Sequence, residues 1–181
     1  DALILCEFYH TYPQGDDRVL HISQPRISLD IDDVCGNFLP HYAERFNTTL
    51  NPYWNCSYQM KDHLKEIEND KEFWLSMPAL NPPPFEPDIY VSSRNIPVEW
   101  TMEWLQKNGF PCAPVVHVPW NTSKIDILKE HKIDLHVDDK IQNYRDCVRE
   151  NIFCYLVTAP HNTYLDVANI KTGTYYKFTK K

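Results

Sequence analysis

Residues 26–38 read RISLDIDDVCGNF, and this stretch determines the predicted fold. A short β-forming run leads into Asp30, and two more carboxylates follow at Asp32 and Asp33. Because unpaired buried charge is costly, three carboxylates at the end of a buried strand need either a cation or solvent. A solvated turn would account for them equally well, since Asp is a common turn residue. The rest of the chain has to decide between these two interpretations.

The composition is that of an ordinary globular protein. Of the 181 residues, 43% are hydrophobic and 24% are charged, which favours a single domain with a small insertion. No apolar run approaches the ~18 residues of a membrane-spanning helix, so we expect no membrane partner. The net charge of −7, without a long basic run, argues against a nucleic-acid polymer as partner. The six cysteines form no CxxC pair, which favours reduced thiols and a cytoplasmic location.

Beyond residue 87 the pattern alternates between short apolar strands and helices. We predict helices at 97–108, 122–132 and 141–151. The strands around them are predicted at 26–30, 88–92, 113–119, 133–138 and 152–157. Such an alternation is typical of a parallel sheet covered by helices on both faces. The predicted fold class is therefore α/β, with a Rossmann-like parallel sheet.

Two further segments flank this core. Residues 1–25 contain two strand-like runs around the turn-rich PQGDD, which predicts an N-terminal β-hairpin. Residues 38–80 have a helical pattern rich in aromatic side chains, and the Pro-rich stretch 81–87 ends it. Because this segment begins directly after the Asp cluster, we expect a small helical cap inserted into a core made of 26–37 and 81–181.

Polar side chains cluster at the ends of the predicted strands. In open α/β sheets, ligands bind outside the carboxyl ends of the strands. Residues placed there, or at the start of a following helix, are Asp30, Asp32, Ser92, Ser93, Arg94, Lys124, Asp138 and Asp139. Taken singly, each could be a turn, cap, loop or solvated surface residue. Their joint placement at one sheet edge instead predicts a single site.

These residue types suit phosphoryl transfer. Carboxylate oxygens bind Mg²⁺ through a few contacts and leave positions for water and phosphate. The metal and Lys124 would neutralise the phosphoryl oxygens, and Ser92 would donate a hydrogen bond to one of them. Asp30 is the candidate nucleophile, which would form an aspartyl-phosphate, and Asp32 is the candidate acid and base.

The same residues form an ordered set of motifs. Over about residues 26–160 the chain resembles the haloacid dehalogenase-like (HAD) superfamily of phosphohydrolases, with LDIDDV, YVSS, Lys124 and LHVDD in the places of its four motifs. The resemblance implies that Asp30 is the nucleophile and Asp32 the acid and base. It also implies a Mg²⁺ ion held by Asp30, the backbone carbonyl of Asp32 and Asp138, with Asp139 as a further candidate ligand.

Within the superfamily, the chain is most similar to the 5′(3′)-deoxyribonucleotidases and related 5′-nucleotidases. Their first motif shares four residues with DIDDVCGNF, namely Asp30, Asp32, Val34 and Phe38. VTAPHN, at 157–162, resembles the Pro-x-Asn ending that follows their last core strand. The similarity implies a 5′-nucleotidase whose substrate is a (deoxy)nucleoside monophosphate.

Three residues depart from the nucleotidase pattern. Asp33 replaces the motif glycine, although Asp tolerates the left-handed turn that glycine allows. Asn37 replaces an aspartate, and Arg94 stands where these enzymes usually have proline. The last two changes bear on the choice of substrate, so they weaken the nucleotidase prediction more than the phosphatase prediction.

The remaining predictions concern the substrate and the alternatives. Phe38 would lie against the nucleoside, and Ser93 and Arg94 would contact the substrate. Phe73 and Trp74 would offer rings on which a base stacks, although helix core is the commoner role of such rings.

Alternative functions are a phosphatase for another small phosphomonoester or a polynucleotide 3′-phosphate, and a non-catalytic HAD-like binding module. A homodimer is left open.

Overall fold

The computed structural model describes most of the chain. The described residues are 4–11, 17–23, 25–51, 56–83, 85–157, 159–162 and 175–180. The predicted N-terminal segment and the end of the chain are therefore described only as strands, without their side chains.

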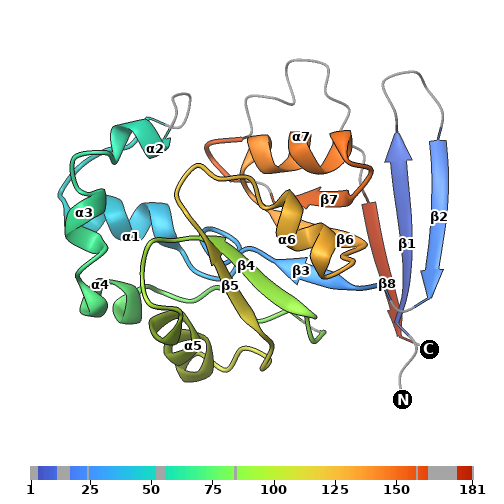
Figure 1. The fold of residues 1–181 in the computed structure, drawn as a ribbon, viewed down its shortest axis with the longest axis horizontal. Helices are drawn as coiled ribbons and strands as arrows, with labels where there is room; N and C mark the ends of the chain where they lie inside the picture. Colours follow the sequence, from blue (N-terminus) through green and yellow to red (C-terminus); the bar gives the residue numbers. More distant parts are fainter. Residues whose placement is uncertain are drawn as a thin grey trace.

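A five-stranded, all-parallel sheet forms the centre of the protein (Figure 1). Its strands, in the spatial order β5-β4-β3-β6-β7, are β5 (Val115–Val118), β4 (Ile89–Ser93), β3 (Ile27–Leu29), β6 (Leu135–Asp138) and β7 (Phe153–Leu156). The predicted α/β class is confirmed. The chain runs outward from β3 to β5 and then returns to the other side of β3 at β6. The carboxyl ends of β3 and β6 therefore flank a topological switch point, where open α/β sheets bind ligands.

Helices cover both faces of this sheet. The three core helices are α5 (Val98–Lys107), α6 (Ile125–Glu130) and α7 (Ile141–Arg149). Trp104 of α5 belongs to the core cluster that contains Leu29 of β3. On the other face, Leu128 of α6 belongs to the cluster that contains Val91 of β4. Since both faces are buried, the strands read as apolar runs rather than as alternating ones.

Four short helices lie between β3 and β4, where the sequence predicts a helical insertion. They are α1 (Phe38–Arg45), α2 (Cys56–Gln59), α3 (Leu64–Ile67) and α4 (Lys71–Ser76), and Figure 1 shows them together at one end of the sheet. They are shorter than the aromatic-rich pattern suggests. Asn47, with a positive φ of 46°, follows the end of α1. The Asp70 carboxylate begins α4 by accepting a hydrogen bond from the Phe73 N–H at 3.0 Å.

A second, antiparallel sheet pairs strands from the first and last parts of the described chain. β1 (Ile4–Thr11) pairs with β2 (Asp17–Ser23), in the segment for which a hairpin is predicted. β8 (Tyr175–Lys180) pairs with the other edge of β1, so the order is β2-β1-β8 (Figure 1). The sequence analysis does not predict β8, because a strand that pairs with the far end of the chain leaves no local signal.

Two further observations concern the described part of the chain. None of its helices is long and apolar enough to cross a membrane. Its free cysteines are Cys35, Cys112, Cys147 and Cys154, and three of these are buried.

Candidate active site

Asp30 directly follows β3, at the carboxyl edge of the parallel sheet. Its backbone N–H donates to the Val137 carbonyl at 2.9 Å, and its side chain is buried. Oδ1 accepts a hydrogen bond from the Ile31 N–H at 2.7 Å, and Oδ2 lies 3.0 Å from Lys124 Nζ. Burial, only partly offset by Lys124, raises the pKa of Asp30 to about 8. At neutral pH this carboxyl therefore needs a further cation to be fully ionised.

Lys124 links the ends of β3 and β6. Its ammonium nitrogen donates to Asp138 Oδ2 at 2.7 Å and also contacts Asp30, and the residue is only 2% exposed. Burial alone would lower the pKa of Lys124, but the two carboxylates raise it above its ordinary value. The fold thus brings Lys124 to the edge where the sequence predicts it.

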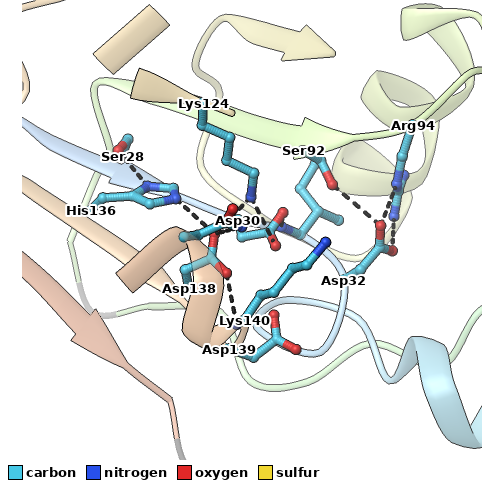
Figure 2. A network of polar contacts seen from close by, with 12 residues as sticks. Ser28, Asp30, Asp32, Ser92, Arg94, Lys124, His136, Asp138, Asp139 and Lys140 are labelled. Atoms are coloured by element: carbon cyan, nitrogen blue, oxygen red, sulfur yellow. Dashed lines mark hydrogen bonds and ion pairs between the residues drawn. The ribbon is translucent and has the colours of Figure 1, made fainter. Parts of the chain in front are cut away.

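Asp138 is the fully buried carboxylate at the end of β6. Its oxygens accept hydrogen bonds from four groups, the side chains of Lys124, His136 and Asn143 and the backbone N–H of Lys140 (Figure 2). Burial alone would raise the pKa of Asp138, but Lys124 and His136 hold it well below its usual range. Asp138 is therefore a fixed negative charge.

His136 supports Asp138 from behind. Its Nε2 lies 2.8 Å from Asp138 Oδ2, and its Nδ1 lies 2.8 Å from the Ser28 hydroxyl (Figure 2). Burial lowers the pKa of His136, which favours a neutral ring that donates from Nε2 and accepts from Ser28. His136 is not among the site residues predicted from the sequence. Its position two residues before Asp138, on the same side of the strand, was the signal for this contact.

Asp32 is held in a bidentate ion pair with Arg94. Arg94 Nη2 lies 2.6 Å from Asp32 Oδ1, and Nε donates to Oδ2 at 3.0 Å (Figure 2). The guanidinium also donates to Thr101 Oγ1 at 2.8 Å and lies 4.6 Å from the ring centre of Trp74. With 2% of its surface exposed, Arg94 orients Asp32 and does not face a substrate. Its predicted role as a substrate contact is therefore corrected.

The two serines of β4 differ in their surroundings. Ser92 is fully buried and donates its hydroxyl to Asp32 Oδ2 at 3.2 Å. A serine has a single O–H, so a hydrogen bond from Ser92 to a phosphoryl oxygen requires the hydroxyl to rotate away from Asp32, and this role stays a prediction. Ser93 lies next to it, partly exposed and paired with Val118 of β5, and its substrate contact stays a prediction.

Asp139 belongs to the same edge and is tied to the loop after β7. Its Oδ2 lies 2.6 Å from His161 Nε2, and its backbone carbonyl accepts a hydrogen bond from Asn162 Nδ2 at 2.8 Å. Burial raises the pKa of Asp139, although His161 opposes the shift. The loop carrying PHN therefore closes onto the site. This stretch is the one that resembles the Pro-x-Asn ending of the nucleotidases. The sequence did not predict a contact for His161.

The turn after Asp32 directs the chain from the strand into α1. Asp33 has a φ of 57°, the left-handed conformation expected where the motif has glycine. Its carboxylate accepts the Leu39 N–H at 3.1 Å, and burial raises the pKa of Asp33 to about 8. Gly36 closes the turn, and a side chain there would collide with Met77.

Lys140 is a second cation at the carboxyl edge of the parallel sheet. It is not among the site residues predicted from the sequence. Figure 2 shows its side chain extending from the end of β6 toward Asp32. Within the described part of the chain its ammonium forms no ion pair, unlike that of Lys124. Its position immediately after Asp139 could have identified Lys140 as a candidate residue of the site. Lys140 is thus available to contact an anionic ligand.

Phe38, Phe73 and Trp74 lie in the hydrophobic core. Phe38 stacks on Trp74 with 5.6 Å between ring centroids and 12° between planes, and Phe73 meets Phe38 edge to face at 6.1 Å. None of the three is more than 3% exposed. The rings therefore offer no accessible platform for a base. For Phe73 and Trp74 this is the core packing that the sequence left open as an alternative. For Phe38 the predicted contact with a nucleoside is wrong, because the ring is buried against Trp74.

Asp30, Asp138 and Asp139 form an acidic cluster that could hold a metal ion. One carboxylate oxygen of each lies within 4.8 Å of the others, and all three residues are buried. Three carboxylate donors match the preference of Mg²⁺ for oxygen ligands. Lys124 contacts Asp30 and Asp138, whereas Asp139 contacts His161. A divalent cation would offset the negative charge that remains on the cluster. The side chain of Asp32 lies outside this cluster, since both of its oxygens face Arg94.

No protein-family model matches the chain, and no curated protein matches it. The assignment of a function therefore rests on the fold and on the geometry of the site.

Proposed function

We propose that this protein is a Mg²⁺-dependent phosphomonoester hydrolase of the HAD type. The observation that carries the proposal is the buried cluster in which Asp30 and Asp138 share the Lys124 ammonium, at the switch point of a parallel sheet. This cluster supports the proposal because it combines a carboxylate that could act as nucleophile, a fixed cation and a set of oxygen donors at the edge where such sheets bind ligands.

Asp30 is the proposed nucleophile. The Ile31 N–H fixes one oxygen of its carboxylate, and the other lies beside Lys124. A carboxylate oxygen forms a bond to phosphorus as the ester P–O bond breaks, and the departing alcohol oxygen takes up a proton. Water then attacks the aspartyl-phosphate, which releases phosphate and restores the Asp30 carboxylate.

The other groups of the site position Asp32 and neutralise negative charge on the phosphoryl group. Arg94 and Ser92 hold Asp32 in one orientation while leaving lone-pair capacity on its oxygens for proton transfer. Lys140, whose ammonium has no carboxylate partner among the described residues, is the proposed contact for a phosphoryl oxygen. When bound by Asp30, Asp138 and Asp139, Mg²⁺ would neutralise negative charge on the phosphoryl group.

The finer assignment to the 5′-nucleotidases loses its main structural support. That assignment expected Phe38, Phe73 and Trp74 to contact the nucleoside, and all three rings are buried. We therefore propose a phosphomonoesterase and treat nucleoside monophosphates as one candidate substrate among several.

Metal removal provides the first test. The purified protein should hydrolyse an aryl phosphate in the presence of Mg²⁺, lose this activity in excess chelator and regain it when Mg²⁺ is restored. The reason is that the buried carboxylates repel one another without a cation. Full turnover in chelator would contradict the metal site. Binding of inorganic phosphate without any turnover would instead favour the non-catalytic binding module.

Replacing Asp32 tests proton transfer. Asp32→Asn should lower kcat for the aryl phosphate by roughly 10²- to 10⁴-fold, the usual contribution of a general acid or base. Asp126→Asn, on the exposed side of α6, is the control and should keep the wild-type rate. Circular dichroism checks the fold of the variant, because Asn also weakens the ion pair with Arg94. A correctly folded Asp32→Asn protein with wild-type kcat would rule out the proposed role.

A further inference from the structure

A cavity beside the proposed site is not used by the chemistry described above. Its volume is about 440 Å³, within the usual range for small-molecule sites. It lies between α1 and the loop after β7, and Asp33 and His161 are among its lining residues. Because His161 contacts Asp139 at 2.6 Å, the cavity adjoins the acidic cluster.

The walls of the cavity are mainly aliphatic. They include Leu39, Pro40, Ala43, Leu50 and Leu80. No aromatic ring other than the His161 imidazole is among the described residues that line it, so its walls do not provide a stacking platform of the kind predicted from Phe38 and Trp74. An occupant would be held by the burial of its own apolar surface.

The described lining of the cavity provides no lysine or arginine for a second anionic group. Among the described residues that line it, none is a lysine or an arginine, and the ionisable ones are Asp33 and His161. His161 is already paired with Asp139, another carboxylate. A second phosphate or a carboxylate on the ligand would therefore be buried without a lysine or arginine partner among these residues, which is costly.

The cavity offers hydrogen-bond partners to neutral polar groups of a ligand. Asn37, Thr48 and Thr49 supply an amide and two hydroxyls. The Nδ1 atom of His161 is buried and has no hydrogen-bond partner in the structure. These groups can exchange hydrogen bonds with hydroxyl or amide groups of an uncharged ligand.

We propose that this cavity binds the leaving group of the substrate, and that this group is a neutral alcohol up to about the size of a nucleoside, without a second phosphate or a carboxylate. The inference rests on the proposed phosphomonoesterase function and specifies its substrate class. The phosphoryl group lies at Asp30, while the alcohol extends along the turn through Asp33 and Asn37 into the cavity.

Blocking the cavity tests the inference. Ala43→Phe places a ring inside it, and Thr48→Phe does so from an exposed position where folding is not at risk. Glu44→Phe adds the same ring at the neighbouring exposed position of α1, outside the cavity, and serves as the matched control. The two substrates are 4-methylumbelliferyl phosphate, with a bulky leaving group, and methyl phosphate, with one too small to fill the cavity.

Both blocking variants should lower kcat/KM for 4-methylumbelliferyl phosphate by roughly 10- to 200-fold, the range for a misfit in an apolar pocket. They should leave the value for methyl phosphate close to wild type, and Glu44→Phe should change neither value. In the wild type, a nucleoside 3′,5′-bisphosphate should have a kcat/KM at least about tenfold below that of the 5′-monophosphate, because its second phosphate lacks a lysine or arginine partner among the described lining residues. A bisphosphate used equally well would overturn the charge argument.

A binding measurement separates failure of this inference from failure of the proposed function. 4-Methylumbelliferone alone, titrated by its fluorescence, should bind the wild type and Glu44→Phe but neither blocking variant. Such binding without turnover would support the cavity and refute the phosphomonoesterase. Turnover of the bulky substrate unaffected by Thr48→Phe would overturn the cavity inference, whether or not Ala43→Phe folds, and would leave the enzyme assignment standing.

Discussion

Asp30→Asn is expected to reduce turnover on the order of 10⁴- to 10⁶-fold, the loss typical of removing a covalent nucleophile. An asparagine amide cannot form the acyl-phosphate bond at this position. Its Oδ1 can still accept the Ile31 N–H, so the local backbone should be retained. The measurement is the initial rate with an aryl phosphate and Mg²⁺, together with acid-quenched mass spectrometry for a phosphoryl adduct on Asp30 in the wild type.

The control for this variant is again Asp126→Asn, which removes an exposed carboxylate from α6 and should keep the wild-type rate. Inhibition by inorganic phosphate should persist in Asp30→Asn, because Lys124 and Lys140 remain. If Asp30→Asn kept a rate near that of the wild type, the covalent route through this residue would be wrong, and direct attack by water would replace it.

Lys124→Met is expected to lower the free energy of unfolding by about 3–5 kcal/mol, the usual cost of leaving a buried charge without its partner. Lys124 contacts both Asp30 and Asp138, and all three residues are buried. Methionine preserves much of the side-chain volume, so the loss reports mainly the missing charge and hydrogen bonds. Urea unfolding, monitored by circular dichroism, measures the change.

Lys129→Met is the matched control, because Lys129 pairs with Glu150 while about half of each side chain is exposed. Its loss should be only ~0–1 kcal/mol, as for other surface ion pairs. Mg²⁺ should restore part of the lost stability in Lys124→Met, since a cation bound to the folded state alone shifts the equilibrium toward it. Equal losses in the two variants would mean that Lys124 does not neutralise the carboxylate pair.

The order of the core elements is a property that the sequence determines. Apolar runs such as IYVS and LHVD, separated by helical patterns, predict the parallel sheet because both of its faces are buried. The placement of Asp30 and Asp138 at strand ends follows from that pattern, since parallel strands end at a common edge. The left-handed turn at Asp33 also follows locally, from the tolerance of Asp for positive φ.

The tertiary structure alone decided which partner each side chain of the site has. Arg94 and Ser92 are both predicted to face a substrate, and in the structure both contact Asp32, about 60 residues earlier in the chain. Phe38 is predicted to face a nucleoside, and it packs against Trp74. The physical reason is that a local pattern shows where a strand ends and which residue types stand there. The distance between two side chains depends on how segments far apart in the sequence pack together, and hydrogen bonds and ring contacts form only at those distances.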